Sequence, residues 1–202
     1  LLMNRSELIE FIREAEKNEI ELCIHMIGDR SLEEAISAFE SFYTLENEHR
    51  LIHVQIASKK QLQRIKKLNL RLSIQPAFYS SDLLIAEKRL GKERFFELGY
   101  PFNKMRDLKI NISFSTDSPI ESASPFKNIA SADHFFSRIE SLYYYSEAGK
   151  KFETQDSSVE LVPGNDADLF VSETDILNST EETLSKAEAV YTLVNGELVY
   201  KK

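Results

Sequence analysis

Four short apolar segments, separated by helical patterns, constrain the fold of this chain more than any other feature. We expect strands within residues 19–26, 51–55, 70–75 and 110–115. The stretches between them place apolar side chains at helical spacing, most clearly in residues 6–18, 31–43, 58–68 and 82–98. Strands that alternate with helices in this way predict βα units and a parallel sheet.

The predicted fold class is therefore α/β, and the pattern is compatible with two architectures. Four βα units amount to half of an eight-stranded (β/α)8 barrel, the TIM-like barrel. An open, doubly wound sheet is the structural competitor, because it has the same alternation of strands and helices. We favour the barrel, and we assign residues 1–152 to it as one domain.

The C-terminal part of the sequence has a different pattern. Asn195-Gly196 lies between two alternating runs, which predicts a β-hairpin with a type I′ turn. A turn at Pro163-Gly164 leads into another apolar run. We therefore predict a small second β element in residues 153–202, with the boundary in the polar and aperiodic stretch at residues 152–159.

The composition is that of an ordinary globular protein, and it limits the partners we expect. Of the 202 residues, 42% are hydrophobic and 29% are charged, with a net charge of −8. This charge argues against nucleic acid and against an anionic membrane surface as partners. No apolar run approaches the roughly 20 residues that span a bilayer. Cys23 is the only cysteine, which excludes an intramolecular disulfide and fits a cytoplasmic location.

Three expected strand ends carry side chains that can bind a metal. His25 lies near the end of the first strand, His53 near the end of the second, and Asp117 just after the fourth. Alternation predicts that all three lie on the less apolar face, and parallel barrels have their active sites at the C-terminal ends of the strands. Imidazole and carboxylate groups are suitable ligands for Zn²⁺ or a similar divalent ion. A lone strand histidine is more often a packed core group, and the residues alone leave both interpretations open.

Other polar side chains near the strand ends have less defined roles. Asp29 and Arg30 follow the first strand directly and could orient a ligand, although a helix cap or a structural ion pair is the simpler role. Gln75 ends the third strand and could reach a substrate. Cys23 is expected in the core. Two further histidines have polar neighbours and are expected at the surface, namely His49 and His134.

Six segments resemble, in the same order, motifs of the amidohydrolase superfamily, in amidohydrolase family 3 and the branch that includes N-substituted formamide deformylase. Residues 25–30 are similar to the HAIGDRA motif, and residues 49–55 to RHRIEHAQ. The other four resemblances are residues 73–76 to SxQP, 115–119 to GSDAP, 163–171 to PGKDADLVV, and 192–200 to TxVxGxxVY.

This resemblance implies a fold and a chemistry. The fold would be the C-terminal half of a (β/α)8 barrel, strands 5–8, with a small β element of a composite β-sandwich. His25, His53 and Asp117 would bind a divalent metal, with zinc favoured, and Asp117 would also act as the catalytic general base on a metal-activated water. The substrate would be a small molecule with an amide, formamide or cyclic amide bond.

Three departures from the family pattern qualify these expectations. The HxH motif and the strand-4 ligand are absent, so we expect an incomplete enzyme that is inactive alone and that forms a homo-oligomer or pairs with a missing N-terminal half. Ile52 stands where the branch usually has glutamate. The segment between Asp117 and Pro163 is short for the family. The competing hypothesis is a degenerate, non-catalytic half-barrel that serves as a scaffold or interaction module.

Overall fold

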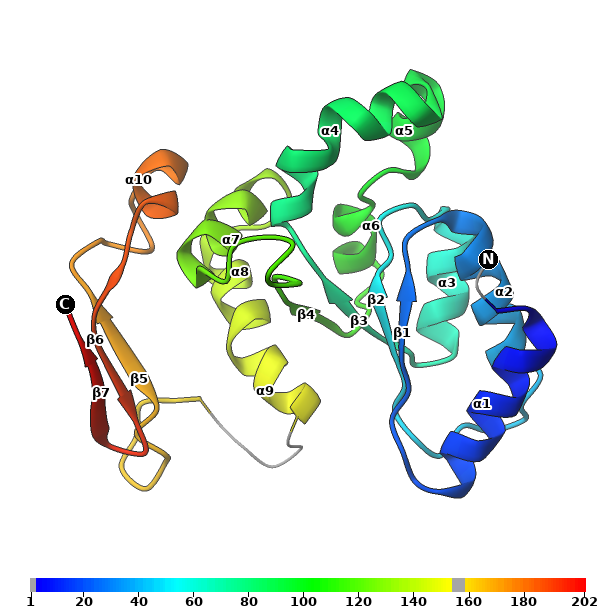
Figure 1. Cartoon of the computed structure of the whole chain (residues 1–202), viewed down its shortest axis with the longest axis horizontal. Helices are drawn as coiled ribbons and strands as arrows, with labels where there is room; N and C mark the ends of the chain where they lie inside the picture. Colours follow the sequence, from blue (N-terminus) through cyan, green and yellow to red (C-terminus); the bar gives the residue numbers. More distant parts are fainter. Residues whose placement is uncertain (1–2, 154–158) are drawn as a thin grey trace. The chain divides into compact units, whose positions relative to one another are not determined.

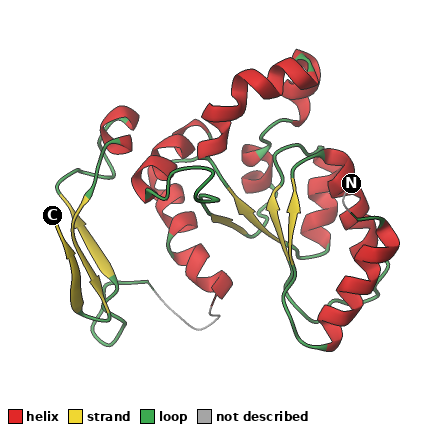
Figure 2. Cartoon of the chain, in the orientation of Figure 1, coloured by secondary structure: helices red, strands yellow, loops and turns green. Residues whose placement is uncertain are grey.

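Strands and helices alternate along most of the chain in a mixed α/β arrangement, which Figure 2 shows by colour. The computed structural model describes residues 3–153 and 159–202, which form two compact units. Unit 1 comprises Leu1–Ile74 and Ser81–Ser113, and unit 2 comprises Gln75–Ser80 and Phe114–Lys202. The predicted boundary between residues 152 and 153 adjoins residues 154–158, which lie outside the described residues, so the predicted domains stay a prediction. No helix in the described part of the chain is both long and apolar enough to cross a bilayer.

The larger sheet has the strand order β1-β2-β3-β4, which is the order of the sequence (Figure 1). Strand β1 is parallel to β2, and β2 is parallel to β3. Each strand is shorter than its predicted segment: β1 (Cys23–Met26), β2 (Arg50–His53), β3 (Arg71–Ile74) and β4 (Ile112–Phe114). Strand β2 also begins one residue before the segment predicted for it. The order of these four strands contains no reversal, whereas a doubly wound sheet reverses its order at a switch point.

The first three helices lie on one side of strands β1 and β2 (Figure 1). They are α1 (Arg5–Lys17), α2 (Asp29–Phe39) and α3 (Lys59–Lys67). Asn4 and Ser58 cap α1 and α3, each in a capping box with the residue three positions later. Three further helices follow in the sequence: α4 (Ala77–Leu90), α5 (Lys92–Leu98) and α6 (Phe102–Asp107). Gly91, with a φ of 79°, separates α4 from α5, where the sequence predicted one continuous helix.

The core of unit 1 lies between these helices and the sheet. Helices α1, α2 and α3 each turn one apolar stripe inward, as the helical spacing predicted. On the sheet, Ile24 pairs with Leu51, and Leu51 pairs with Leu72, so one apolar row crosses three strands. The largest side chains that are wholly buried include Ile12, Leu32, Ile36, Phe39, Leu51 and Leu72. Burying each of them stabilises the fold by about 1.5–3 kcal/mol.

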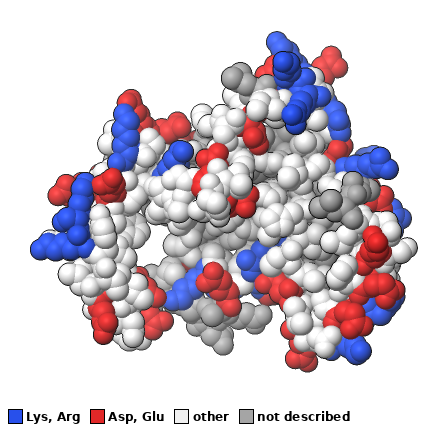
Figure 3. Space-filling view, in the orientation of Figure 1, with Lys and Arg blue, Asp and Glu red and all other residues white. Residues whose placement is uncertain are grey.

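Charged side chains cover the outer surface of the first helices in pairs of opposite sign. Figure 3 shows acidic and basic side chains side by side over α1. Arg13 lies 2.6 Å from Glu10, and Arg5 lies 3.0 Å from Glu34. Such exposed pairs each stabilise the fold by at most about 1 kcal/mol, so their main effect is to make this surface hydrophilic.

Unit 2 combines short helices with a small antiparallel sheet. The helical elements are α7 (Pro125–Ser131), the 3-10 helix η1 (Ala132–His134), α8 (Arg138–Tyr145), α9 (Glu147–Glu153) and α10 (Glu181–Ser185). The sheet has the order β5-β6-β7, with β5 (Leu169–Ser172), β6 (Ala189–Val194) and β7 (Glu197–Lys201). Its core packs α7 against α10 through Phe126, Ile129 and Leu184.

The predicted type I′ hairpin connects β6 and β7. Asn195 has a φ of 51° and Gly196 a φ of 79°, and this turn type requires a positive φ at both positions. The N–H of Asn195 donates to the Asp168 carboxylate at 2.7 Å, and the N–H of Gly196 donates to the carbonyl of Ala167 at 3.1 Å. The hairpin prediction is therefore confirmed.

Candidate functional site

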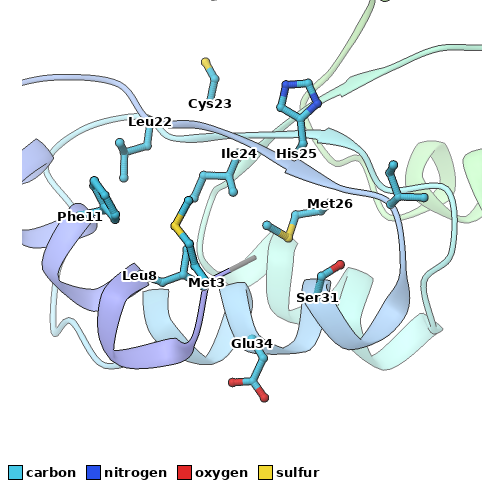
Figure 4. Close-up of a pocket in the computed structure, with 11 residues that line it drawn as sticks. Met3, Leu8, Phe11, Leu22, Cys23, Ile24, His25, Met26, Ser31 and Glu34 are labelled. Atoms are coloured by element: carbon cyan, nitrogen blue, oxygen red, sulfur yellow. The ribbon is translucent and has the colours of Figure 1, made fainter. Parts of the chain in front are cut away.

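His25 lies on the face of β1 that is turned away from the helices. Figure 4 shows Cys23 and His25 on one side of the strand, with Ile24 and Met26 on the side of α1 and α2. His25 is exposed, whereas Met26 is only 6% exposed. This division follows from the two-residue repeat of a strand, in which successive side chains point to opposite faces.

His53 does not reach the same face by alternation. In the parallel register, His25 pairs with Ile52, and Met26 pairs with His53. Paired residues of a regular sheet point to the same face, so a regular β2 would direct His53 toward the helices together with Met26. His53 therefore lies on the predicted face, but regular alternation along β2 is not the reason.

The backbone conformation at the end of β2 explains the position of the His53 side chain. His53 has a φ of 76°, and Val54 has a φ of 50°. A parallel strand has a φ near −120°, so the His53 φ differs from it by roughly 200°. A rotation of that size about the N–Cα bond moves the Cβ to the other face of the strand. A positive φ is a genuine outlier for a β-branched residue such as Val54.

The result is a close pair of imidazoles at the C-terminal ends of two adjacent parallel strands. The Nδ1 atom of His25 lies 2.9 Å from the Nε2 atom of His53, and the ring centroids are 4.9 Å apart. This separation is that of a hydrogen bond between the two rings, whose donor depends on the tautomer. It is also compatible with a shared divalent metal, because two nitrogens that are each about 2.0–2.1 Å from one ion lie no more than about 4 Å apart. Imidazole nitrogens suit zinc and several other transition metals. Within the described residues, no group of three or more His, Cys, Asp or Glu side chains is arranged to hold a metal.

Asp117 belongs to unit 2, and the segment before it is fixed there by two buried amides. Gln75 donates from Nε2 to the hydroxyl of Ser115 at 2.7 Å. Asn128 donates from Nδ2 to the Ser115 carbonyl at 3.0 Å and accepts from the N–H of Ala77 at 3.3 Å. Asp117 itself is half-buried with a φ of 57°. Its role as a metal ligand and base stays a prediction.

Asn128 was not among the predicted site residues, and little in the sequence distinguishes it. Asn128 is 1% exposed and lies inside α7, eleven residues after Asp117 in the sequence. Asparagine has a low helix propensity, so its place inside a helix was the one available indication.

Asp29 makes a structural ion pair, which is one of the two simpler roles that the sequence suggested. Both of its carboxylate oxygens accept from Nη2 of Arg94, at 2.7 and 2.8 Å. It is the first residue of α2, whose N-cap is Gly28. Arg30 is exposed. A direct role of Asp29, Arg30 or Gln75 toward a substrate stays a prediction.

His49 is buried, so the prediction that it lies at the surface is wrong. It is 1% exposed and connects α1 to the sheet. Its Nδ1 accepts from the N–H of Leu22 at 3.1 Å, which leaves the ring proton on Nε2 to be donated to Glu16 at 2.8 Å. Glu16 also accepts from the backbone N–H groups of Glu46 and Asn47, at 2.7 and 3.1 Å. These partners are distant in sequence, so the polar neighbours of His49 gave no sign of them.

Two other expectations about burial have opposite outcomes. Cys23 is exposed, so its predicted place in the core is wrong. The reason is that it shares the His25 face of β1, opposite the face that α1 and α2 cover (Figure 4). His134 is exposed, as the sequence predicted.

A largely apolar pocket of about 590 Å³ lies between α1 and the helix-facing side of β1 (Figure 4). Several of its apolar lining residues are themselves exposed, among them Phe11 and Ile27, both at 54%. Strand β1 is at one end of the strand order, and among the described residues its only strand partner is β2. The pocket adjoins this strand, because residues of β1 line it.

Comparison with known proteins places the chain in a family. The model described as "Amidohydrolase family" matches residues 2–200. The Bacillus subtilis (strain 168) protein named "Putative amidohydrolase YtcJ" is 27% identical over 209 residues, which cover 95% of this chain and 39% of that protein. This chain is therefore similar to YtcJ over nearly its whole length while spanning about two fifths of the relative.

Two crystal structures described as uncharacterized metal-dependent hydrolases are also similar to this chain. The Pyrococcus horikoshii OT3 protein is 30% identical with a TM-score of 0.78, and the match covers 90% of this chain and 40% of that one. The Pyrococcus furiosus protein is 34% identical with a TM-score of 0.68, over 75% of this chain and 33% of that one. The family match over residues 2–200, the YtcJ similarity and these two folds agree with each other, and the chain belongs to the amidohydrolase family.

Proposed function

We propose that this chain is the C-terminal part of a metal-dependent hydrolase that cleaves a C–N bond in a small amide, formamide or cyclic amide. The observation that carries this proposal is the 2.9 Å separation between Nδ1 of His25 and Nε2 of His53 at the ends of adjacent parallel strands. Membership of the amidohydrolase family supports the same chemistry. The single cysteine, Cys23, supports a cytoplasmic location.

The proposed architecture is the later half of a (β/α)8 barrel, with strands β1 to β4 as barrel strands 5–8. The sequential strand order supports it, because a barrel adds its strands in order. The position of α1 to α3 on one side of β1 and β2 supports it as well, because barrel helices form an outer layer (Figure 1). The sheet β5-β6-β7 would contribute to a composite β-sandwich.

In this proposal, His25 and His53 hold a divalent ion, with zinc favoured, through Nδ1 and Nε2. The remaining ligands come from Asp117 and from protein beyond these 202 residues. When bound, the ion lowers the pKa of a water molecule and polarises the scissile carbonyl. The carboxylate of Asp117 accepts the proton of the attacking water as general base. Gln75, which donates to Ser115, would contact the substrate or support the residues that do. Asp29 and Arg30, in the first turn of α2, would have the same kind of role.

The proposed partner of this chain is the remaining part of the same barrel, which would pair along β1 and fill the adjacent apolar pocket. The matched relatives support this choice, because the chain covers only 39% and 40% of the length of two of them. We expect the 202-residue chain and a separately expressed preceding segment to form a one-to-one complex in light scattering. A homodimer of this chain that persists in the presence of that segment would contradict the proposed partner.

A scaffold without catalytic activity is the second candidate function, and one observation favours it. Ile52 shares a row of the sheet with His25, so an aliphatic side chain stands beside the proposed metal ligand where the family branch usually has a glutamate. A carboxylate at that position could support the metal centre, and its loss would weaken catalysis.

Hydrolysis by the reconstituted enzyme distinguishes the two functions. We expect the chain, co-expressed with the preceding segment, to hydrolyse one or more N-substituted formamides or cyclic amides only when a divalent metal is present. Asp117→Asn should lower kcat by about 10²–10⁴-fold, because it removes the general base. His134→Ala, at an exposed histidine, should leave kcat unchanged. A reconstituted, metal-loaded complex without hydrolase activity would favour the scaffold.

A further inference from the structure

The loop that follows His53 is held in place along both of its sides. On the first side, the N–H of Val54 donates to the carbonyl of Met26 at 2.8 Å, and the N–H of Ile56 donates to the carbonyl of Ile27 at 3.2 Å. These bonds connect the loop to the end of β1. They hold the peptide group directly after His53 next to the strand that carries His25.

On the second side, the loop pairs with residues 98–100, which lead from α5 to α6. The N–H of Ala57 donates to the carbonyl of Leu98 at 3.0 Å. The N–H of Tyr100 donates to the carbonyl of Gln55 at 2.6 Å, and Ile56 forms an antiparallel bridge with Gly99. Residues 98–100 therefore act as a short extra strand beside the loop.

A side-chain network reinforces this second side. The hydroxyl of Tyr100 donates to Oδ2 of Asp82 at 2.7 Å. The amide of Gln55 donates to the same Oδ2 at 3.2 Å and to the Tyr100 hydroxyl at 3.1 Å. Gln55 is 8% exposed and Tyr100 is 5% exposed. Each polar proton of the network thus has an acceptor in a partly buried site, where such bonds are stronger than they are in water.

The ring of Tyr100 is itself fixed by aromatic neighbours. The ring of Phe102 packs edge-on against it at a centroid distance of 5.6 Å, and Phe95 does so at 6.3 Å. The hydroxyl position is therefore determined by packing that is independent of the hydrogen bonds. Removal of the hydroxyl alone would leave this aromatic packing intact.

We propose that Tyr100 is a positioning residue for His53, acting through Asp82 and Gln55. Its hydroxyl holds the loop in the conformation in which the His53 backbone keeps a positive φ, and that φ aims the imidazole at His25. The left-handed conformation of His53 and Val54 is disfavoured for an isolated chain and persists only where surrounding contacts impose it. The hydrogen-bonded side of the loop supplies those contacts. This inference rests on the proposed function in one respect, which is that the aligned imidazole pair binds a metal.

The test compares Tyr100→Phe with Glu16→Gln in the 202-residue chain. Tyr100→Phe removes the hydroxyl at the His53 end of β2, and Glu16→Gln weakens the hydrogen bonds to His49 near the other end. We expect Tyr100→Phe to weaken Co²⁺ binding by about 10- to 100-fold in an absorbance titration, as loss of a supporting group does at other metal sites. Glu16→Gln should lower the thermal midpoint and leave the Co²⁺ affinity unchanged.

A metal-free measurement keeps this inference separate from the proposed function. The nuclear Overhauser effect between the His25 and His53 rings should be present in the wild type and in Glu16→Gln, and lost or weakened in Tyr100→Phe. If the wild type does not bind Co²⁺, the proposed function fails, and the ring contact still decides the inference. Equal ring contacts in Tyr100→Phe and in the wild type would overturn it. If Tyr100→Phe does not fold, Gln55→Met serves in its place, since it removes both amide donors at similar volume.

Discussion

The buried link between α1 and the sheet should make His49 one of the most sensitive positions of unit 1. His49→Phe keeps a ring of similar size against Phe39, whose centroid lies 5.2 Å away, and removes both hydrogen bonds. The N–H of Leu22 then has no acceptor at Nδ1, and Glu16 loses one of its donors. An unsatisfied buried group costs about 1–3 kcal/mol, so we expect the free energy of unfolding to fall by about that amount.

His49→Ala should be more destabilising, because it also removes the ring. A large-to-small change at a buried aromatic position costs about 3–5 kcal/mol. The difference between His49→Ala and His49→Phe then measures the packing of the ring separately from its hydrogen bonds. His134→Ala is the matched control, because this exposed histidine should change the free energy of unfolding by no more than about 0.5 kcal/mol.

Urea unfolding followed by circular dichroism measures these differences, since the chain has no tryptophan to serve as a fluorescent probe. Amide hydrogen exchange at Leu22 adds a local measurement, and its protection should fall in both His49 variants. A His49→Phe variant as stable as the wild type, with Leu22 still protected, would refute this reasoning.

Three further predictions concern single interactions. Hydrogen bonds from Glu46, Asn47 and His49 outweigh the effect of burial and lower the pKa of Glu16, so its carboxylate stabilises the fold above the unfolded-state pKa of about 4.3. That contribution should disappear as the pH falls through the lower folded-state pKa. The difference in the free energy of unfolding between wild type and Glu16→Gln should therefore become smaller from pH 7 to pH 3. A difference that stays constant over this range would contradict the prediction. Gly196→Ala should destabilise unit 2 by about 1 kcal/mol or more in thermal unfolding, because the backbone at Gly196 has a φ of 79°. Gly149→Ala should instead stabilise unit 2 by about 0.5–1 kcal/mol, because Gly149 lies inside α9 with open space around it. Asp29→Asn should lower the free energy of unfolding by at most about 1 kcal/mol, because the ion pair between Asp29 and Arg94 is partly exposed. Added salt should make this difference from the wild type smaller.

Much of the fold could be predicted from local pattern, because local chemistry determines it. The alternating segments became β1 to β4, and the Asn195-Gly196 pair became the hairpin turn, since only a few residue types accept two successive positive φ angles. The spacing of Ser58 and Gln61 predicts a capping box, which is present, whereas the same spacing at Ser31 and Glu34 does not cap α2, whose N-cap is Gly28. The helix break at Gly91 was missed, although glycine is the residue type that most often marks such a break.

The candidate site shows where local pattern is insufficient. Alternation identified His25 correctly, because β1 is regular through that residue. It could not identify the backbone reversal at His53, since the contacts that impose a positive φ come from the loop's pairing with Met26 and with Tyr100. The burial of His49 was missed for the same reason, because its partners come from α1 and from the residue just before β1.

The zinc content of the purified 202-residue chain tests the central claim most directly, which is that His25 and His53 form a preformed half of a metal centre. After incubation with excess zinc and removal of the unbound ion, plasma mass spectrometry should find about one zinc per chain in the wild type and in His134→Ala. It should find far less in His25→Ala, which loses one of the two nitrogens that share the ion. Equal zinc content in His25→Ala and in the wild type, or none in either, would contradict the account.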